Sequence, residues 1–196
     1  MTQRSPSETT ATTAGEALPV FTIGHSTRTI ADFVTLLRAG QVQLVVDIRR
    51  MPRSRANPQY NIDVLPAELA GHQINHMRIA ELGGLRKKID MPPETNGFWT
   101  NRSFHNYADY ALTNEFQRGL NCLLQVSAGQ RTAIMCAEAV WWRCHRRIVA
   151  DYLINAGRTV YHLMDTDEVR AATLTAGAVR AGHKLHYPAS ASRRMG

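Results

Sequence analysis

Short apolar runs recur along the chain at intervals that suit buried β-strands. Each run is only a few residues long and is followed by glycine, polar or charged residues, which is typical of strands in a parallel sheet. The runs lie at 20–23, 43–48, 74–79, 132–135 and 159–163. This pattern predicts five strands.

Amphipathic segments separate these runs and predict helices. After the first strand, Ile30, Phe33, Val34 and Leu37 recur at i, i+3, i+4 and i+7, and Gly40 ends the segment. A helix over this segment would bury one apolar face against the sheet. Similar patterns predict helices at 63–71, 104–112, 113–124 and 148–157, and capping spacing at Asp165 and Glu168 predicts a last helix.

The alternation of strand and helix indicates a single α/β domain over residues 19–182. We expect a mostly parallel five-stranded sheet with helices on both faces, a Rossmann-like arrangement. Residues 1–18 are rich in Thr, Ser and Ala without a signal-peptide pattern, which favours a disordered tail. The polar segment 183–196 is expected to be loosely ordered. The irregular stretch 89–103 has the length of a lid or binding loop.

Composition narrows the class of protein. The chain has 196 residues, of which 44% are hydrophobic, and no apolar run approaches the roughly 20 residues of a membrane-spanning helix. Three cysteines, two of them close together, favour a reduced, cytoplasmic protein over a disulfide scaffold. The net charge of +7 favours anionic partners such as nucleotides, nucleic acid or phosphorylated metabolites. The excess of Arg over Lys would also arise from genome base composition alone.

Charged clusters follow three of the predicted strands, at 49–55, 86–88 and 143–147. Loops that follow parallel strands share one edge of the sheet, and α/β folds bind ligands at that edge. We therefore expect these clusters to converge there with His25 and Cys136. The helix after the fourth strand would add unpaired N–H groups, which suit an anion.

Cys136 ends a predicted strand before a loop and a helix, a layout comparable to that of cysteine-dependent phosphatases and rhodaneses. Cations and a helix dipole lower the pKa of a thiol there. Arg143 follows Cys136 with six residues between them, one more than in the phosphatase loop, and the loop has no glycine. Either Cys136 or Cys144 would be the nucleophile, with His25 or His145 as base. The alternative for both cysteines is a buried structural role.

Other polar residues of this region have two interpretations each. Glu138 is a general base or a salt-bridge partner, and Asp47 orients Arg49 or caps the backbone. Trp142, with Trp141, stacks on a base or covers the loop or a dimer contact. Three arginines are candidates for binding an anion: Arg49, Arg55 and Arg146.

A metal site is the remaining alternative for the sulfur and imidazole groups. Cys136, Cys144, His145 and His25 are the candidate ligands. The spacing of the cysteines is too wide for a zinc knuckle, and the cationic surroundings disfavour another cation. We therefore predict no metal ligands and leave the cofactor unknown.

A set of short motifs resembles the domain-of-unknown-function 488 family over residues 20 to 165. The motifs are Thr22-Ile23-Gly24-His25-Ser26, Asp47-Ile48-Arg49, Pro52-Arg53-Ser54-Arg55-Ala56-Asn57-Pro58, Leu82-Gly83-Gly84, Tyr107-Ala108-Asp109-Tyr110, Met135-Cys136-Ala137-Glu138 and Cys144-His145-Arg146. The resemblance implies a small bacterial or archaeal α/β protein without an established reaction. It adds Ser26, Ser54 and Asn57 to the site residues named above. Many members have a proline before Cys-His-Arg, where this chain has Val140-Trp141-Trp142.

These observations lead to three hypotheses. The first is an enzyme that acts on a phosphate-bearing or nucleotide-like anionic small molecule at a Cys/His/Arg site on the carboxyl edge of the sheet. The second is a non-catalytic module that binds nucleotide or nucleic acid through the same basic edge. The third is a metal-dependent enzyme with Cys and His ligands. A second copy of the chain is a further candidate partner, and a membrane is not.

Overall fold

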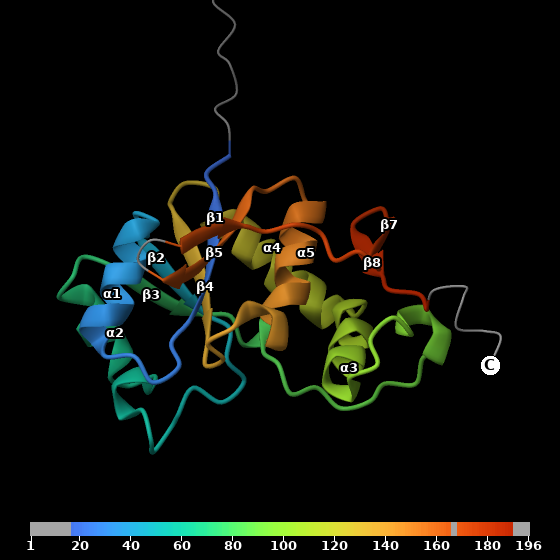
Figure 1. The fold of residues 1–196 in the computed structure, drawn as a ribbon, viewed down its shortest axis with the longest axis horizontal. Helices are drawn as coiled ribbons and strands as arrows, with labels where there is room; N and C mark the ends of the chain where they lie inside the picture. The colour runs from blue at the N-terminus through green and yellow to red at the C-terminus, as the bar shows by residue number, and fades with distance from the viewer. Residues whose placement is uncertain (1–16, 166–167, 190–196) are drawn as a thin grey trace, which may run out of the picture.

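A six-stranded sheet forms the centre of the molecule, in the order β3-β2-β4-β1-β5-β6 (Figure 1). The structure is a computed structural model that describes residues 17–165 and 168–189 of the chain. All neighbouring strands pair in parallel except β5 and β6. The strands are β1 Val20–Gly24, β2 Leu44–Asp47, β3 Asn75–Arg78, β4 Thr132–Cys136, β5 Val160–Asp165 and β6 Glu168–Ala171. The α/β class is thus confirmed, with one strand more than predicted.

The extra strand replaces the helix expected after Asp165. Residues Glu168–Ala171 form β6, which turns back and pairs antiparallel with β5. The capping spacing of Asp165 and Glu168 was misleading because no apolar i, i+3, i+4 repeat follows it. Without an apolar face a helix has nothing to bury, so the chain extends the edge of the sheet instead.

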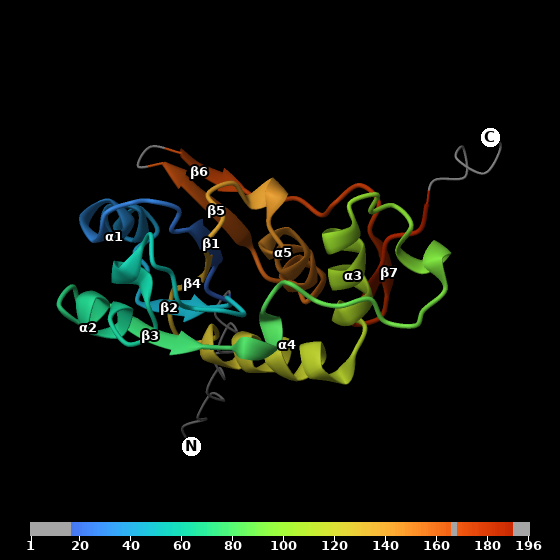
Figure 2. The same cartoon turned by 90° about the horizontal axis from the view of Figure 1, so that it is seen from below.

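Helices cover both faces of the sheet, as predicted (Figure 2). α1 and α2 lie on one face, α4 and α5 lie on the other, and α3 lies beyond α4 and α5, away from the strands. Successive side chains of a strand point to opposite faces of the sheet. In β1, Val20 packs on the face covered by α4 and α5, whereas Phe21 and Ile23 pack on the face covered by α1 and α2. The helices are α1 Ile30–Ala39, α2 Leu65–Ala70, α3 Arg102–Ala111, α4 Asn114–Val126 and α5 Arg146–Asn155. Short 3-10 turns are η1 Pro58–Tyr60, η2 Ala80–Leu82, η3 Pro93–Asn96 and η4 Trp141–Arg143.

Capping residues set the start of α1 where the sequence predicted it. The Thr29 Oγ1 accepts a hydrogen bond from the Asp32 N–H at 3.1 Å and donates one to the Asp32 carboxylate at 2.7 Å. Phe33, Val34 and Leu37 are buried against the sheet. No helix in the described residues is long and apolar enough to cross a membrane.

The end of the described chain, which includes the first part of the segment 183–196, packs on the rest of the molecule. β7 Val179–Ala181 and β8 Lys184–His186 form a hairpin, and β8 lies against α5. Leu185 and Tyr187 are fully buried, and the Tyr187 hydroxyl donates to the Asp151 carboxylate at 3.0 Å. Although the segment is mostly polar, Leu185 and Tyr187 lie at i and i+2 and point to the same side of the strand, which is enough to pack a short strand on the protein. Residues 190–196 lie outside the described residues, as do 1–16 of the predicted tail.

The loop at 89–103 packs on the body of the molecule along much of its length. Asn96 is fully buried, donates to the Asp109 carboxylate at 2.8 Å and accepts from the Tyr187 N–H at 3.0 Å. Trp99 is 7% exposed and stacks on Phe104. This loop therefore supports α3 and the C-terminal hairpin.

The loops after β1, β2 and β4 lie side by side because these strands are neighbours at the centre of the sheet. Backbone pairing continues past the strand ends: the His25 N–H donates to Cys136 O at 2.9 Å, and the Ile48 N–H donates to Met135 O at 3.0 Å. The residues that directly follow β1, β2 and β4 are thereby held at adjacent positions.

Candidate functional site

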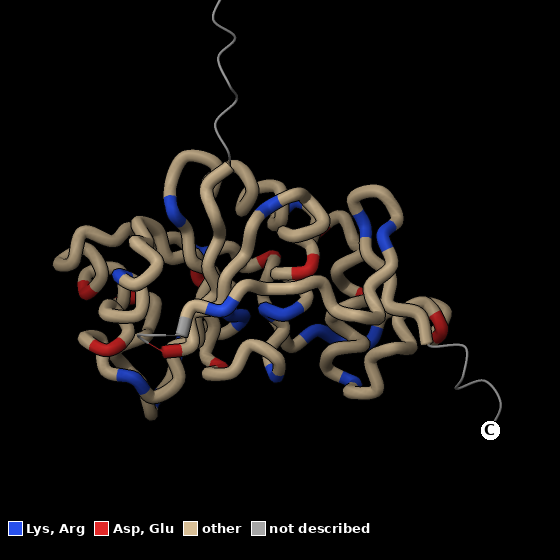
Figure 3. Tube along the Cα trace, turned by 45° about the horizontal axis from the view of Figure 1, so that its top comes forward, with Lys and Arg blue, Asp and Glu red and all other residues tan. Residues whose placement is uncertain are grey.

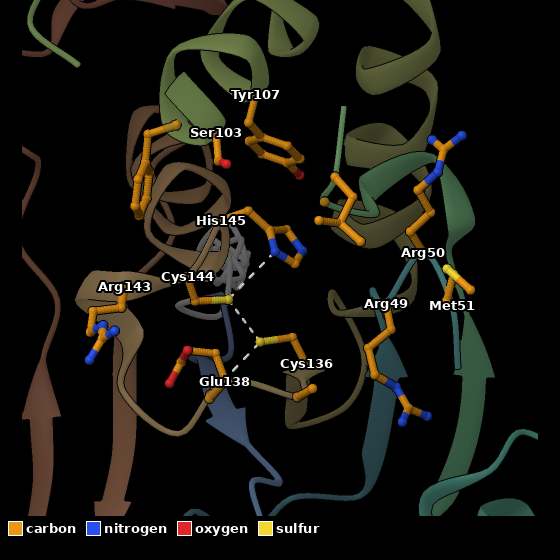
Figure 4. A pocket seen from close by; sticks show the side chains of 14 residues that line it. Arg49, Arg50, Met51, Ser103, Tyr107, Cys136, Glu138, Arg143, Cys144 and His145 are labelled. Carbon is orange, nitrogen blue, oxygen red and sulfur yellow. Dashed lines mark hydrogen bonds between the residues drawn. The ribbon is translucent and has the colours of Figure 1, made fainter. Parts of the chain in front are cut away.

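A pocket of about 390 Å³ opens at the carboxyl edge of the sheet, between α3 and the start of α5 (Figure 4). Its wall combines cysteines and a histidine with arginines and several apolar side chains. The lining residues come from five segments of the chain: Arg49, Arg50 and Met51; Gly84 and Leu85; Ser103, Phe104 and Tyr107; Cys136, Ala137 and Glu138; and Arg143, Cys144 and His145.

Two cysteines meet in the wall of this pocket. The Sγ atoms of Cys136 and Cys144 are 2.8 Å apart, and Figure 4 shows both side chains pointing toward each other. Cys136 is 3% exposed and Cys144 is 4% exposed, so a ligand reaches them mainly through the pocket. The Arg146 guanidinium donates a hydrogen bond to the Cys136 sulfur at 2.8 Å.

These contacts give the two sulfurs different charge states. Burial raises the pKa of Cys136, but the hydrogen bond from Cys144 and the charge of Arg146 outweigh it and lower this pKa to about 7. Burial raises the pKa of Cys144 well above its ordinary value, and the hydrogen bond to Cys136 raises it further. Cys136 is therefore the more acidic thiol of the pair, and Cys144 is the thiol that donates to its thiolate form.

His145 places a free lone pair beside Cys144. Its Nε2 lies 3.2 Å from the Ile48 carbonyl, which can only accept, so Nε2 carries the proton and Nδ1 is bare. Nδ1 lies 3.5 Å from the Cys144 sulfur. Burial lowers the pKa of His145 to about 4, so its imidazole is neutral near pH 7. A Cβ on Gly84 would come within 2.8 Å of Nδ1, which explains the need for glycine there.

Arg146 holds the loop between β4 and α5 in place. It is 1% exposed, and its guanidinium donates to the carbonyl oxygens of Ile23, Glu138 and Ala139 at 3.0, 2.7 and 3.2 Å. The Nη1 and Nη2 atoms make these bonds and the one to Cys136, whereas Nε is buried without a partner among the described residues. Because Arg146 does not line the pocket, the anionic group that its guanidinium faces is the Cys136 sulfur. The role of Arg146 in binding a substrate anion stays a prediction.

A second hollow of about 270 Å³ adjoins the first and contains most of the other predicted site residues. His25, Ser26, Ser54 and Asn57 line it, whereas the cysteines do not. The sequence predicts one pocket for all of these groups, whereas the structure has two hollows. Three residues line both hollows and form the wall between them: Arg49, Met51 and Ala137.

Arg49 is fixed in that wall by an ion pair with Asp47. The Arg49 Nη2 lies 2.6 Å from the fully buried Asp47 carboxylate, which also accepts from the Arg49 backbone N–H at 2.9 Å. Both roles proposed for Asp47, orienting Arg49 and capping the backbone, are thus observed. The Arg49 Nη1 donates to the Nε2 of His25 at 3.2 Å.

His25 is not placed to act as a base for either cysteine. Its Nδ1 donates to the Ser26 carbonyl at 2.9 Å, and its Nε2 lone pair accepts from Arg49. The ring stacks on Tyr60 at 4.1 Å, and burial lowers the pKa of His25 to about 4. Of the two predicted bases, only His145 lies beside a thiol.

The remaining predicted residues lie at or beyond the rim. Glu138 lines the first pocket with an exposed side chain. Arg55 and Trp142 are exposed and line neither hollow. Trp141 stacks on His162 at 4.2 Å, so one face of this indole packs against the protein. The Ser54 hydroxyl accepts from the Asn57 N–H at 3.1 Å and stabilises the local turn.

The sequence analysis did not place several wall residues in the site. Tyr107 and Gly84 belong to the motifs of the family resemblance, which was the one signal that would have found them. Met51 and Leu85 are 73% and 75% exposed and line the pocket mouth. Their positions depend on irregular loops, and no periodic pattern predicts those.

The cysteines and His145 also form a cluster that has the composition of a metal site. The ligand atoms of Cys136, Cys144 and His145 lie within 4.8 Å of one another, and His25 is not part of this group. Two thiolates bound to one zinc ion at about 2.3 Å would lie roughly 3.8 Å apart. The observed sulfur separation of 2.8 Å is shorter, so direct contact between the sulfurs suits this geometry better.

An α/β domain with a Cys/His cluster at the carboxyl edge of its sheet is the class of protein that these features define. The chain belongs to the family described as "Domain of unknown function DUF488", whose model matches residues 29–153. This membership confirms the resemblance noted in the sequence. Comparisons with curated proteins and with solved structures found no match.

Proposed function

We propose that the protein is a thiol-dependent enzyme that uses Cys136 as its nucleophile on an anionic small molecule bound in the first pocket. The proposal rests on the position of the Cys136 sulfur in the pocket wall, where Arg146 and Cys144 both donate to it. A thiolate is the nucleophilic form of cysteine, and a pKa near 7 keeps much of Cys136 in that form at neutral pH.

The pocket wall suggests an anion that carries an apolar part. Arg50 and Arg143 line the pocket with exposed guanidiniums, and neither forms an ion pair within the described parts of the chain. Unpaired guanidiniums attract carboxylate and phosphate groups. Met51, Leu85 and Phe104 supply apolar surface beside them. A phosphate- or carboxylate-bearing organic molecule fits this combination.

The reactivity of Cys136 tests this proposal. Wild-type protein is treated with iodoacetamide from about pH 5 to about pH 10, and carbamidomethylation of each cysteine is followed by peptide mass spectrometry. The Cys136 rate is expected to reach half its maximum near pH 7, because the thiolate is the reacting form. Cys122, in the same samples, reports on an ordinary partly buried cysteine. Labelling of Cys136 that begins only above about pH 9 contradicts the proposed nucleophile.

The arginines at the pocket mouth test the anionic substrate. A thermal-shift screen of phosphate- and carboxylate-bearing metabolites is expected to find ligands that protect Cys136 from iodoacetamide. Arg143→Ala should weaken the affinity for such a ligand about tenfold, the loss expected for one charged hydrogen bond. Arg55→Ala is the matched control, because Arg55 is exposed and lines neither hollow. Equal losses in both variants would mean that net charge, and not the pocket, attracts the ligand.

Nucleic-acid binding is the less favoured use of the same edge. Lys and Arg residues are spread over many elements and interspersed with acidic residues (Figure 3), so the trace shows no single basic stripe. A nucleic-acid interface with many phosphate contacts would give an affinity that falls steeply with salt. A pocket ligand that makes one or two charged contacts would give a shallow slope.

A metal-dependent enzyme is a second candidate, because Cys136, Cys144 and His145 lie together with His145 Nδ1 directed at Cys144. An imidazole whose other nitrogen donates to a carbonyl is a common arrangement at metal sites. The cation Arg146, 2.8 Å from Cys136, places this candidate second. One tightly held zinc or iron ion per chain in purified protein would reverse the order.

A further inference from the structure

His145 directs its free lone pair at Cys144 and not at Cys136. In a hydrolase or transferase with one cysteine nucleophile, the base serves that nucleophile or an attacking water. Here the Nδ1 of His145 is 3.5 Å from the Cys144 sulfur, while the Cys136 sulfur accepts from Arg146 and Cys144 and lies 3.9 Å from the Glu138 carbonyl oxygen. The base is therefore aimed at the second thiol of the pair.

Within the described residues, the Cys144 sulfur has three polar partners. Its sulfur contacts Cys136 at 2.8 Å, His145 at 3.5 Å and the Arg146 backbone N–H at 3.4 Å. That N–H belongs to the first residue of α5, so a negative charge on Cys144 would meet a helix N-terminus. A thiol with an adjacent base, a helix N-terminus behind it and a second sulfur in front of it is set up to attack that sulfur.

The distance between the sulfurs suits bond formation. A disulfide has a sulfur–sulfur length of about 2.05 Å, so the pair observed at 2.8 Å would close by a shift of roughly 0.8 Å. Both cysteines are almost fully buried, so access to them is through the pocket that would hold the substrate.

We propose that the enzyme carries out thiol–disulfide exchange, with Cys136 as the attacking cysteine, Cys144 as the resolving cysteine and His145 as the base for Cys144. The substrate class is a small-molecule disulfide that carries an anionic group. This inference rests on the proposed nucleophilic role of Cys136 and adds the reaction type and the role of the second thiol.

Two exchange steps account for all atoms and electrons. The Cys136 thiolate attacks one sulfur of R–S–S–R′, which forms a Cys136–S–S–R mixed disulfide and releases R′–S⁻. The Cys144 sulfur then attacks the Cys136 sulfur while its proton moves to the Nδ1 of His145. The Cys136–Cys144 disulfide forms and R–S⁻ leaves, so the substrate gains the two electrons that the protein loses. An external dithiol returns the protein to its reduced state by the same exchange chemistry.

Oxidised glutathione, a small anionic disulfide, is the probe for the test. Reduced full-length protein is mixed with it near pH 7.5, quenched with acid at intervals and analysed by intact and peptide mass spectrometry. The wild-type chain is expected to show a disulfide that links the Cys136 and Cys144 peptides, with a glutathione adduct at Cys136 only at early times. The Cys144→Ser variant should retain one glutathione on Cys136. Cys122 in the same samples gives the rate of unassisted glutathionylation.

The variant His145→Asn separates the two steps. It should slow conversion of the mixed disulfide to the internal disulfide at least tenfold relative to formation of the adduct. If wild-type protein keeps glutathione on Cys136 as long as Cys144→Ser does, the resolving role is wrong while the nucleophile stands. If Cys136 reacts no faster than Cys122 with either glutathione or iodoacetamide, the proposed function fails as well. The disulfide between the Cys136 and Cys144 peptides and the comparison of Cys136 with Cys122 are both measured on wild-type protein, so a poorly folding variant leaves these two results intact.

Discussion

At the scale of single residues, the sequence predicts those side-chain contacts whose two partners are close together along the chain. Asp47 and Arg49 end one strand two positions apart, so their ion pair follows from an extended backbone. The contact between Cys136 and Cys144 did not follow, because an irregular loop joins them and its path has no periodic signal. Arg146 was assigned to a substrate anion because the helix start was known to be basic, whereas its carbonyl partners could not be inferred from the sequence.

The substitution Arg146→Lys tests the buried guanidinium. A lysine cannot donate to Cys136 and to the carbonyls of Ile23, Glu138 and Ala139 together, so several buried acceptors lose a donor. We expect the free energy of unfolding to fall by about 3 kcal/mol, a cost typical of breaking a buried charged network. The iodoacetamide profile of Cys136 should shift to higher pH because a donor to the thiolate is lost.

The matched control for this experiment is Arg143→Lys. Arg143 lies three residues before Arg146, is exposed, and forms no ion pair within the described residues. Urea unfolding should show a change within about 0.5 kcal/mol for this exposed site. Similar destabilisation in both variants would contradict the structural role assigned to Arg146.

At the scale of elements, the short apolar runs located the central strands of the parallel sheet, and the i, i+3, i+4 repeats located its helices. The edge strand β3 has the sequence Asn-His-Met-Arg and is held between the apolar residues Ile74 and Ile79. These signals succeed because a buried face must be apolar at the period of the element that carries it. They failed after residue 164, where β6 and the β7–β8 hairpin are short and mostly exposed. A strand that buries one side chain leaves almost no pattern, so its pairing is decided by tertiary contacts that the sequence does not display.

The substitution Leu185→Ala tests whether the C-terminal hairpin contributes to stability. Leu185 is fully buried between β8 and α5, so we expect a loss of 2–5 kcal/mol in the free energy of unfolding, measured with urea. Val179→Ala, in the same hairpin, is the control because Val179 is 51% exposed. A loss below about 1 kcal/mol for Leu185→Ala would mean that this segment is detached in solution.

At the scale of the whole molecule, burial keeps several histidines neutral. Burial lowers the pKa values of His25, His145 and His162 to about 4, against 6.5 for an unfolded histidine. Below about pH 6.5 the unfolded chain therefore binds protons that the folded chain rejects, and stability falls as pH decreases until the folded pKa values are reached.

We expect each of these histidines to cost roughly 1–2 kcal/mol of stability between pH 7 and pH 5. Urea unfolding at several pH values measures the slope. The variant His162→Asn should have a shallower slope, because it removes one of the protons taken up on unfolding. His183→Gln, at an exposed position of the hairpin turn, should leave the slope unchanged. A flat profile between pH 7 and pH 5 would contradict the burial of these three groups.

The partition between the two hollows limits the shape of what they hold. Arg49 is clamped by Asp47 and by the Tyr60 carbonyl, and its side chain extends away from the sulfurs in Figure 4. Because this ion pair is buried, the guanidinium is held in the wall and keeps the two hollows separate. A compound that occupied both the cysteine side and the His25 side would have to pass over the wall at Met51, a flexible residue that is 73% exposed. Compact molecules confined to the sulfur side are thus admitted more readily than elongated ones.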